Sequence, residues 1–447
     1  MSLKDGDFAH LTLALALLLV AAHGFGWLAV RLRQPRVAGE IIGGLVLGPT
    51  LFGLVLPDWQ HATFASSEVA ETGLRVAYQL GLILLMYCSG TQLRSIMSRA
   101  EGRPVAAISF VGSVLPFLAG LALVLNWDGA DRFIGGADDR VAFALVFALA
   151  MAVTSIPVIS RIMADLNLLG TRFARVVLSV AVLEDIAVYV LLNIALSRVS
   201  PDGSDHHGLP GLLDLEATSG VGQAYYAVAT LLFFVVPLAL GPGFVGRLSR
   251  LRVNVVQRSS PVAFQLVVLF ALTGAAAFIG VAPMFGALVA GILASDLGPE
   301  DEAARKTIHT FAYASFIPLY FALVGLRLDL AHDLRPLFFL VFLAIACLVK
   351  ASSCYLGARV AGERPVDAGN LAVALNARGG PGIVLASIAF DAAFIDASFY
   401  TSLVMLAIVT SLGAGFLLQR SLRRGTLSEA LPSESQAIDQ PSNPSSR

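Results

Sequence analysis

Charged residues are scarce in this chain. Asp, Glu, Lys and Arg make up 14% of its 447 residues, against about a quarter in a soluble globular domain. The formal net charge of −1 gives no indication of a nucleic-acid partner, and we expect none. The 3 cysteines, Cys88, Cys347 and Cys354, lie in apolar stretches and give no readable disulfide framework or metal-ligand set. The shortage of charge excludes an ordinary soluble protein.

Apolar residues dominate instead. They make up 57% of the chain, and its mean hydropathy is +0.78. The first apolar stretch, residues 8–30, has no basic segment before it and is too long for a signal-peptide core, so we expect a retained span. Similar stretches recur as far as Leu418. The fold class is therefore an all-α polytopic membrane protein.

The apolar stretches predict about thirteen transmembrane helices. They cover residues 8–30, 36–56, 69–93, 104–126, 140–163, 174–197, 223–246, 260–280, 281–296, 307–327, 334–359, 367–390 and 397–419. Lys and Arg gather in alternate short loops, which predicts an external N-terminus and a cytoplasmic C-terminus. The predicted location is the inner (plasma) membrane of the cell. The Ser- and Pro-rich tail, 425–447, is predicted to be a disordered cytoplasmic tail, with no soluble regulatory domain after the membrane part.

Three pairs of spans resemble each other, and each pair is seven spans apart. The pairs are PRVAGEIIGGLVLG (35–48) with APMFGALVAGILAS (282–295), LILLMYCSGTQL (82–93) with IPLYFALVGLRL (317–328), and AVTSIPVIS (152–160) with NARGGPGIV (376–384). An odd offset turns the second copy over in the membrane. The sequence therefore predicts an inverted repeat, in which interrupted helices cross at the midplane.

Two interruptions lie at matching positions of this repeat. One is at Thr154, Ser155 and Pro157; the other contains Asn376, Arg378, Gly379, Gly380 and Pro381. Proline removes a backbone donor and glycine favours unwinding, although a single proline kink is common in membrane helices. Because there are two at matched positions, we predict two crossed, unwound helices. Arg378 is expected to neutralise half-helix ends, and His23 in the first span to be a hydrogen-bonded packing residue.

Three ionisable residues lie deep inside spans. Glu184 and Asp185 are adjacent in VLEDIAVYVLL, and Lys350 lies in AIACLVKASSCYLG. Each charge costs about 2.5–3.5 kcal/mol at a helix centre, so we expect pairing. Adjacent helical residues point about 100° apart, so one acid pairs with Lys350 while the other faces a cavity. A structural ion pair needs one acid, and the surplus acid points to binding of protons or of an alkali cation.

Several motifs together carry a resemblance over residues 8 to about 420. They are RLRQPRVAGEIIGGLVLGPTLFG, LGLILLMYCSGTQL, TSIPVISRIMADLNLLGT, LEDIAVYVLL, IPLYFALVGLRLDL, LVKASSCYLGARVAG and LNARGGPGIVLASIAF. In combination they resemble the monovalent cation:proton antiporter-2 family. The resemblance implies a homodimer of the sodium/proton antiporter fold. It also implies a core domain (about 104–197 and 334–419) beside a dimer scaffold (about 8–93 and 260–327), all within a transmembrane domain of residues 1–424.

The resemblance also implies roles for individual residues. Asp185 matches the aspartate that binds the ion and the proton in turn, and Thr154 the threonine near the ion, so these two are the predicted cation ligands. Lys350 matches the lysine that pairs with the residue at Glu184. Glu departs from the Asp, Asn or Gln that relatives carry there. Its charge favours electrogenic exchange, while the longer arm favours an unbroken pair with Lys350.

The leading hypothesis is an antiporter that exchanges Na⁺ or K⁺ for protons by alternating access, without enzymatic activity or a cofactor. Its partners are then the transported ions, membrane lipid and a second copy of the chain. A solute:sodium symporter on a similar fold, a passive cation channel and an intramembrane protease built on Ser352 and Lys350 are the alternatives. The sequence does not decide between Na⁺ and K⁺, because both cations take oxygen ligands.

Overall fold

A computed structural model describes residues 5–32, 34–64, 67–97, 102–166, 168, 171–196, 208–213, 220–250, 254–295, 297 and 301–427. These residues form helices, with one isolated β-bridge between Ile134 and Ile395. The all-helical prediction is thereby confirmed for this part of the chain. Most of the predicted disordered tail lies outside the described residues.

The elements follow one another along the chain. They are α1 (Asp5–Arg31), α2 (Arg36–Leu47), α3 (Phe52–Val55), α4 (Pro57–Phe64), α5 (Glu68–Met97), α6 (Gly102–Leu125), the 3₁₀ turn η1 (Ala130–Phe133), α7 (Arg140–Ala152), α8 (Ile156–Asp165), α9 (Arg172–Leu196), α10 (Gly208–Leu212), α11 (Gly220–Arg250), α12 (Val255–Ser259), α13 (Pro261–Phe278), α14 (Pro283–Ser295), α15 (Glu302–Ala314), α16 (Phe316–Leu326), α17 (Pro336–Val360), α18 (Pro365–Ala374), α19 (Gly380–Asp391) and α20 (Ala397–Arg423).

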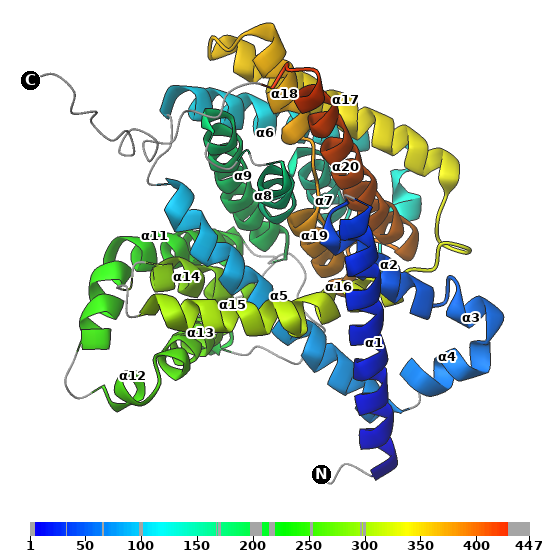
Figure 1. Cartoon of the computed structure of the whole chain (residues 1–447), viewed down its shortest axis with the longest axis vertical. Helices are drawn as coiled ribbons and strands as arrows, with labels where there is room; N and C mark the ends of the chain where they lie inside the picture. The colour runs from blue at the N-terminus through cyan, green and yellow to red at the C-terminus, as the bar shows by residue number, and fades with distance from the viewer. Residues whose placement is uncertain are drawn as a thin grey trace, which may run out of the picture.

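The helices pack in two groups, which Figure 1 shows on opposite sides of the molecule. The core bundle contains α6–α9 and α17–α20, and the scaffold bundle contains α1–α5 and α12–α16. Helix α11 contacts α9 of the first and α14 of the second, while α5 and α2 reach α9 and α20. The predicted division into a core domain and a dimer scaffold stays a prediction.

Each predicted span falls on a helix or a pair of helices, but two spans predicted as continuous are not. The second ends at Leu47, where Gly48 and Pro49 follow. The tenth is divided at Ser315 into α15 and α16, because Pro318 has no N–H to donate to the carbonyl four residues before it. In the described residues, 8 helical segments are long and apolar enough to cross a membrane. The number thirteen stays a prediction.

Helices α2 and α16 approach each other through paired glycines. A Cβ on Gly44 would collide with the Ala322 carbonyl of α16, and one on Gly325 would collide with the Ile41 carbonyl of α2. Only residues without side chains let two backbones lie this close. These glycines therefore serve close packing of α2 against α16.

The same contact recurs between α5 and α14. A Cβ on Gly90 would collide with the Leu288 carbonyl, and one on Gly291 would collide with the Tyr87 carbonyl. In the predicted repeat, α2 corresponds to α14 and α5 to α16, so the two contacts are equivalent, and each joins one half of the repeat to the other. The inverted repeat is thus visible in the packing as well as in the sequence.

Contacts between connecting segments agree with the predicted alternation of faces. The segments joined on one face meet at Thr50–Leu328, Ile134–Ile395 and Arg327–Asp391, and those on the other at Arg172–Glu363 and Asn370–Thr426. In each contact, the order of the predicted spans puts both residues on the same side of the membrane. We call the first side the Arg327 face.

Candidate functional site

Two helices of the core bundle are interrupted. Residues 153–155 separate α7 from α8, and residues 375–379 separate α18 from α19. We call them the first and second breaks. Both occur where the sequence predicts unwinding, but the helix resumes earlier than expected. Pro157, Gly380 and Pro381 lie in the first turns of α8 and α19, where proline is tolerated because the early N–H groups have no helical acceptor.

The two breaks are hydrogen-bonded to each other. The Ser155 backbone N–H donates to the Ala377 carbonyl at 2.7 Å. The Thr154 hydroxyl donates to the Leu375 carbonyl at 2.6 Å. Backbone groups released from one helix are therefore satisfied by those of the other, which is the condition for unwound backbone deep in a membrane. The geometry matches the predicted crossing of two interrupted helices.

Arg378 satisfies the carbonyl end of α7. Its guanidinium, in a residue only 1% exposed, donates to the carbonyls of Ala150 and Met151 at 3.1 and 3.0 Å. It also donates to the Ala346 carbonyl at 2.7 Å and to Asn376 Oδ1 at 2.8 Å. The last carbonyls of a helix have no partner within it and carry partial negative charge. Arg378 thus fills the structural position that its place in the second break predicts.

Lys350 lies fully buried at the same helix end. Its ammonium donates to Glu184 Oε1 at 2.8 Å, to the Gly112 carbonyl at 3.0 Å and to the Ala152 carbonyl, the last of α7. The Gly112 carbonyl is free because Pro116, inside α6, has no N–H for it. All three ammonium protons therefore have acceptors on three different helices.

Glu184 and Asp185 stand side by side on α9, at 2% and 4% exposure. Glu184 Oε1 also accepts from the Ser113 hydroxyl at 3.1 Å. Glu184 Oε2 and Asp185 Oδ1 are buried and have no hydrogen-bond partner among the described residues. Buried polar atoms in proteins are nearly always bonded, so an oxygen without a protein donor points to a ligand from outside the chain. Asp185 is thus the acid that Lys350 does not pair with directly.

The predicted cation ligands come from neighbouring parts of the core. Lys350 contacts both Glu184 and Ala152, so it links the acids of α9 to the end of α7, two residues before Thr154. Thr154 gives its proton to a carbonyl, which leaves its oxygen lone pairs directed elsewhere. Carboxylate, hydroxyl and carbonyl oxygens are the ligands suited to a hard cation. No group of three or more His, Cys, Asp or Glu able to hold a metal ion occurs within the described ranges.

Sequence reasoning missed two members of the site. Ser113 donates to Glu184, and Pro116 frees the carbonyl that Lys350 uses. The signal was present in span four, where a serine lies three residues before a proline in an apolar helix. It could be interpreted only once the neighbouring helix was known.

His23 packs as predicted, outside this site. Its ring nitrogens contact the Ala314 carbonyl at 3.0 Å and Arg36 at 2.6 Å. The Ala314 carbonyl is the one left without a donor by Pro318. Arg36 also pairs with the buried Glu40 at 3.1 Å. This chain of contacts stabilises the interruption between α15 and α16.

Comparison with known proteins gives consistent results. The model of the family "Sodium/hydrogen exchanger, transmembrane" matches residues 15–424. The sodium proton antiporter MjNhaP1 of Methanocaldococcus jannaschii has a similar solved structure, with a TM-score of 0.63 and 14% identity, over 94% of this chain and 98% of that one. At that identity the likeness concerns the fold alone, and it confirms the predicted fold class.

Curated relatives are similar along most of this chain. The K⁺/H⁺ antiporter 1 of Saccharomyces cerevisiae is 28% identical, over 85% of this chain and 42% of its own length. The Na⁺/H⁺-K⁺ antiporter GerN of Bacillus cereus is 26% identical, over 89% and 92%. The Na⁺/H⁺ antiporter NhaS4 of Synechocystis is 28% identical, over 91% and 96%. The chain thus spans less than half of the yeast relative and nearly all of the two bacterial ones.

Proposed function

The chain belongs to the sodium/hydrogen exchanger transmembrane family, and on that premise we propose that it is a secondary antiporter, which exchanges a monovalent cation for protons. It is an integral, multi-pass membrane protein. The relatives named above support both Na⁺ and K⁺ as the cation. The observation that carries the proposal is the buried Asp185 Oδ1, for which the described part of the chain offers no hydrogen-bond partner.

The proposed coupling is competition for Asp185. A proton and a cation neutralise the same carboxylate, so the core can cross between its two orientations with either one but not with both. Thr154 and carbonyls of the breaks would complete the cation's oxygen shell. Arg378 and Lys350 already bond the carbonyls at the end of α7. The cation therefore binds the Asp185 carboxylate rather than those carbonyls.

The proposed movement is that of the core bundle against the scaffold bundle. The glycine contacts of α2 with α16 and of α5 with α14 make the scaffold suited to stay fixed. We propose that the scaffold forms a homodimer, in contact with membrane lipid. We further propose an inner-membrane location, an external N-terminus and a cytoplasmic C-terminus, because Lys and Arg gather in the loops of one face.

The charge carried per cycle depends on Glu184. If the ion pair with Lys350 opens and Glu184 takes a proton, two protons exchange per cation and net charge moves. We propose this electrogenic cycle. Ion-driven current on a supported membrane tests it: a transient current is expected, and exchange that a dye detects without any current in the same preparation would contradict it.

The rival functions receive less support. A protease would need Lys350 as a base for Ser352, but the ammonium has acceptors on three helices, and Ser352 is exposed on the outside of α17. A channel would conduct without a proton gradient. A symporter would move protons or Na⁺ only together with a solute.

Everted vesicles with a pH-sensitive dye test the proposal. After acidification of the lumen, pulses of Na⁺, K⁺ and Li⁺ are added, and antiport predicts that at least one of them releases protons. Vesicles without the protein are the control. No release with any cation would exclude antiport, and release that requires an added solute would favour the symporter.

A further inference from the structure

The three acceptors of the Lys350 ammonium differ in how firmly they are held. The Gly112 carbonyl of α6 and the Ala152 carbonyl of α7 belong to the backbone, on two helices that pack against α17, which carries Lys350. Glu184 Oε1 belongs instead to a rotatable side chain on α9. The two carbonyls therefore form a distinct part of the site, which we call the carbonyl cradle.

Glycine contacts fix the position of α17 against α6. A Cβ on Gly357 would lie 3.0 Å from the Ile108 Cα, and one on Gly112 would lie 2.9 Å from the Cys354 Sγ. Lys350, Cys354 and Gly357 follow one another at spacings of four and three residues, so they share one face of α17. Because both contacts require a glycine, α17 has one close-fitting register along α6, and this register places Lys350 beside Gly112.

A third glycine fixes α6 against α7. A Cβ on Gly120 would lie 2.9 Å from the Ala148 Cα, one turn before Ala152. Glycine at such a crossing lets two helices pack backbone to backbone, which holds the Gly112 and Ala152 carbonyls at a constant separation. The carbonyl cradle is thus built by three helices packed on one another, α6, α7 and α17.

Pro116 makes the α6 half of the carbonyl cradle available. In an uninterrupted α-helix, the N–H of residue 116 would donate to the Gly112 carbonyl. Proline has no N–H, and its ring pushes that carbonyl out of line, so the oxygen is open to the Lys350 ammonium at 3.0 Å. A proline inside a helix is unfavourable by itself. Its place one turn after this carbonyl therefore indicates a compensating contribution to the site.

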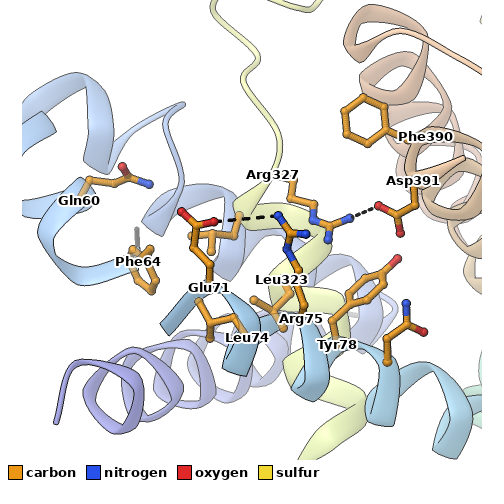
Figure 2. A pocket seen from close by; sticks show the side chains of 12 residues that line it. Gln60, Phe64, Glu71, Leu74, Arg75, Tyr78, Leu323, Arg327, Phe390 and Asp391 are labelled. Carbon is orange, nitrogen blue, oxygen red and sulfur yellow. Dashed lines mark hydrogen bonds and ion pairs between the residues drawn. The ribbon is translucent and has the colours of Figure 1, made fainter. Parts of the chain in front are cut away.

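A second ion pair shows why the ammonium needs these carbonyls. On the Arg327 face, Arg327 contacts Asp391 Oδ1 at 2.8 Å beside a cavity of about 700 Å³, as Figure 2 shows. The exposed fractions of these two side chains are 30% and 39%, so water can replace either partner. The side chains of Lys350 and Glu184 are 0% and 1% exposed. An ammonium that loses Glu184 therefore depends on acceptors of the protein itself.

We propose that the α6 turn from Gly112 to Pro116 is a positioning element for exchange, which holds the Lys350 ammonium at the end of α7 whether or not Glu184 is its partner. Glu184 is then the partner that changes, and Lys350 is a group fixed to the core bundle. Pro116 is a positioning residue, because it acts through the Gly112 carbonyl. The proposal rests on the proposed function, and it names the part of the core that lets the Glu184–Lys350 pair open.

Four chains test the proposal in everted vesicles with the pH-sensitive dye: the wild type, Pro116→Ala, Glu184→Gln and the double variant. Pro116→Ala supplies an N–H that competes with Lys350 for the Gly112 carbonyl. Alone, it should lower the kcat of cation-driven proton release about two- to fivefold and leave the cation KM unchanged, because Glu184 and Ala152 still hold the ammonium. In the double variant the rate should fall at least about threefold below the product of the single effects, because the carboxylate and the free carbonyl are both lost.

Pro237→Ala in α11 is the matched control. It also supplies an N–H inside a helix, but α11 carries none of the three acceptors of Lys350. It should leave kcat and KM unchanged, with or without Glu184→Gln. Effects of Pro116→Ala and Glu184→Gln that simply multiply would overturn the proposal, because a proline that only shapes α6 acts independently of Glu184. A raised KM with an unchanged kcat in Pro116→Ala would also overturn it, since the turn would then serve cation binding.

The same four chains are compared by Tm in detergent, which does not depend on transport. The change in Tm on Pro116→Ala should be more negative in the Glu184→Gln background than in the wild type. Equal changes in both backgrounds would overturn the proposal, even in a chain that transports normally. Absence of cation-driven proton release in the wild type would refute antiport itself, and the comparison of Tm would still decide whether the carbonyl cradle holds Lys350.

A second pair of variants tests the register of α17 along α6 without changing Pro116. Gly112→Ala brings a Cβ to 2.9 Å from the Cys354 Sγ, so it should lower both Tm and kcat. Adding Cys354→Ala removes the sulfur and should restore at least half of both losses. If Cys354→Ala restored neither, the close contact of α6 with α17 would not be what positions Lys350, and the proposal would fail.

Discussion

Both bundles have close glycine contacts, but only the core bundle also joins its backbones through long charged side chains at the breaks. In the scaffold, glycines such as Gly44 and Gly291 remove side chains, so helices meet carbonyl against Cα. In the core, Arg378 and Lys350 insert long charged side chains, which bond carbonyls released by helix ends and by proline. A glycine contact contains no titratable group, and its close fit allows only one relative position of the two helices. The charged contacts of the core concentrate charge at the breaks and leave carboxylate oxygens open to a ligand.

Removing Lys350 tests the charged packing of the core most severely. Lys350→Ala leaves two carbonyls without this donor and Glu184 with the Ser113 hydroxyl alone, and we expect a loss of about 3–5 kcal/mol in the free energy of unfolding. In a Glu184→Gln background the loss should be smaller, since no buried charge is left behind. Denaturant titration in detergent measures the stability of the wild type, both single variants and the double variant, which together form a double-mutant cycle. Losses that simply add would show that the two side chains do not interact in the folded protein.

Filling a glycine tests the scaffold. Gly44→Val places a side chain against the Ala322 carbonyl, and we expect a cost of about 3 kcal/mol or more from overpacking. Gly274→Ala in α13 is the matched control, because a Cβ there meets nothing within 4 Å. It should be neutral or stabilise by about 0.5–1 kcal/mol. If both variants unfolded at the same temperature, close backbone approach would not be what holds α2 to α16.

A smaller effect is expected at Ser113. Ser113→Ala removes one of the two donors to Glu184 Oε1, which should cost about 1 kcal/mol of stability. Heating followed by size-exclusion chromatography measures it. Ser353→Ala, whose hydroxyl bonds the Val349 carbonyl of its own helix, is the comparison and should change less. An effect confined to Ser353 would indicate that Ser113 does not support the acid pair.

The smallest effect is expected in a surface loop, where an ion pair contributes least to stability. Partial burial acts to raise the pKa of Asp329, but hydrogen bonds from His332 and from the Ala331 N–H outweigh it, so this pKa lies below its ordinary value. A carboxyl whose pKa is lowered on folding stabilises the folded protein at pH values above its unfolded-state pKa. This contribution to stability is lost as the pH falls through the folded-state pKa. Asp329→Asn should therefore cost under about 1 kcal/mol at neutral pH. The difference from wild type should shrink in acid, and a constant difference would contradict the assignment.

The sequence predicts much of this contrast, but through different signals. The two breaks and the buried charges are local patterns in the sequence, visible at Thr154, Asn376 and Glu184. The division at Ser315 was missed because Pro318 could equally end a kinked helix. Ser113 and Pro116 were missed because their partners come from α9 and α17. A residue that acts through a freed carbonyl gives no signal until the neighbouring helix is placed.

The roles of the two neighbouring acids are the centre of the account, and one paired measurement tests them. Asp185→Asn and Glu184→Gln are compared in everted vesicles with the pH-sensitive dye, after equal amounts of folded protein are verified in detergent. We expect Asp185→Asn to release no protons on addition of Na⁺, K⁺ or Li⁺, because the carboxylate oxygen that both ligands need is gone. Glu184→Gln should keep exchange, with altered charge transfer. Exchange at the wild-type rate in Asp185→Asn would contradict the account.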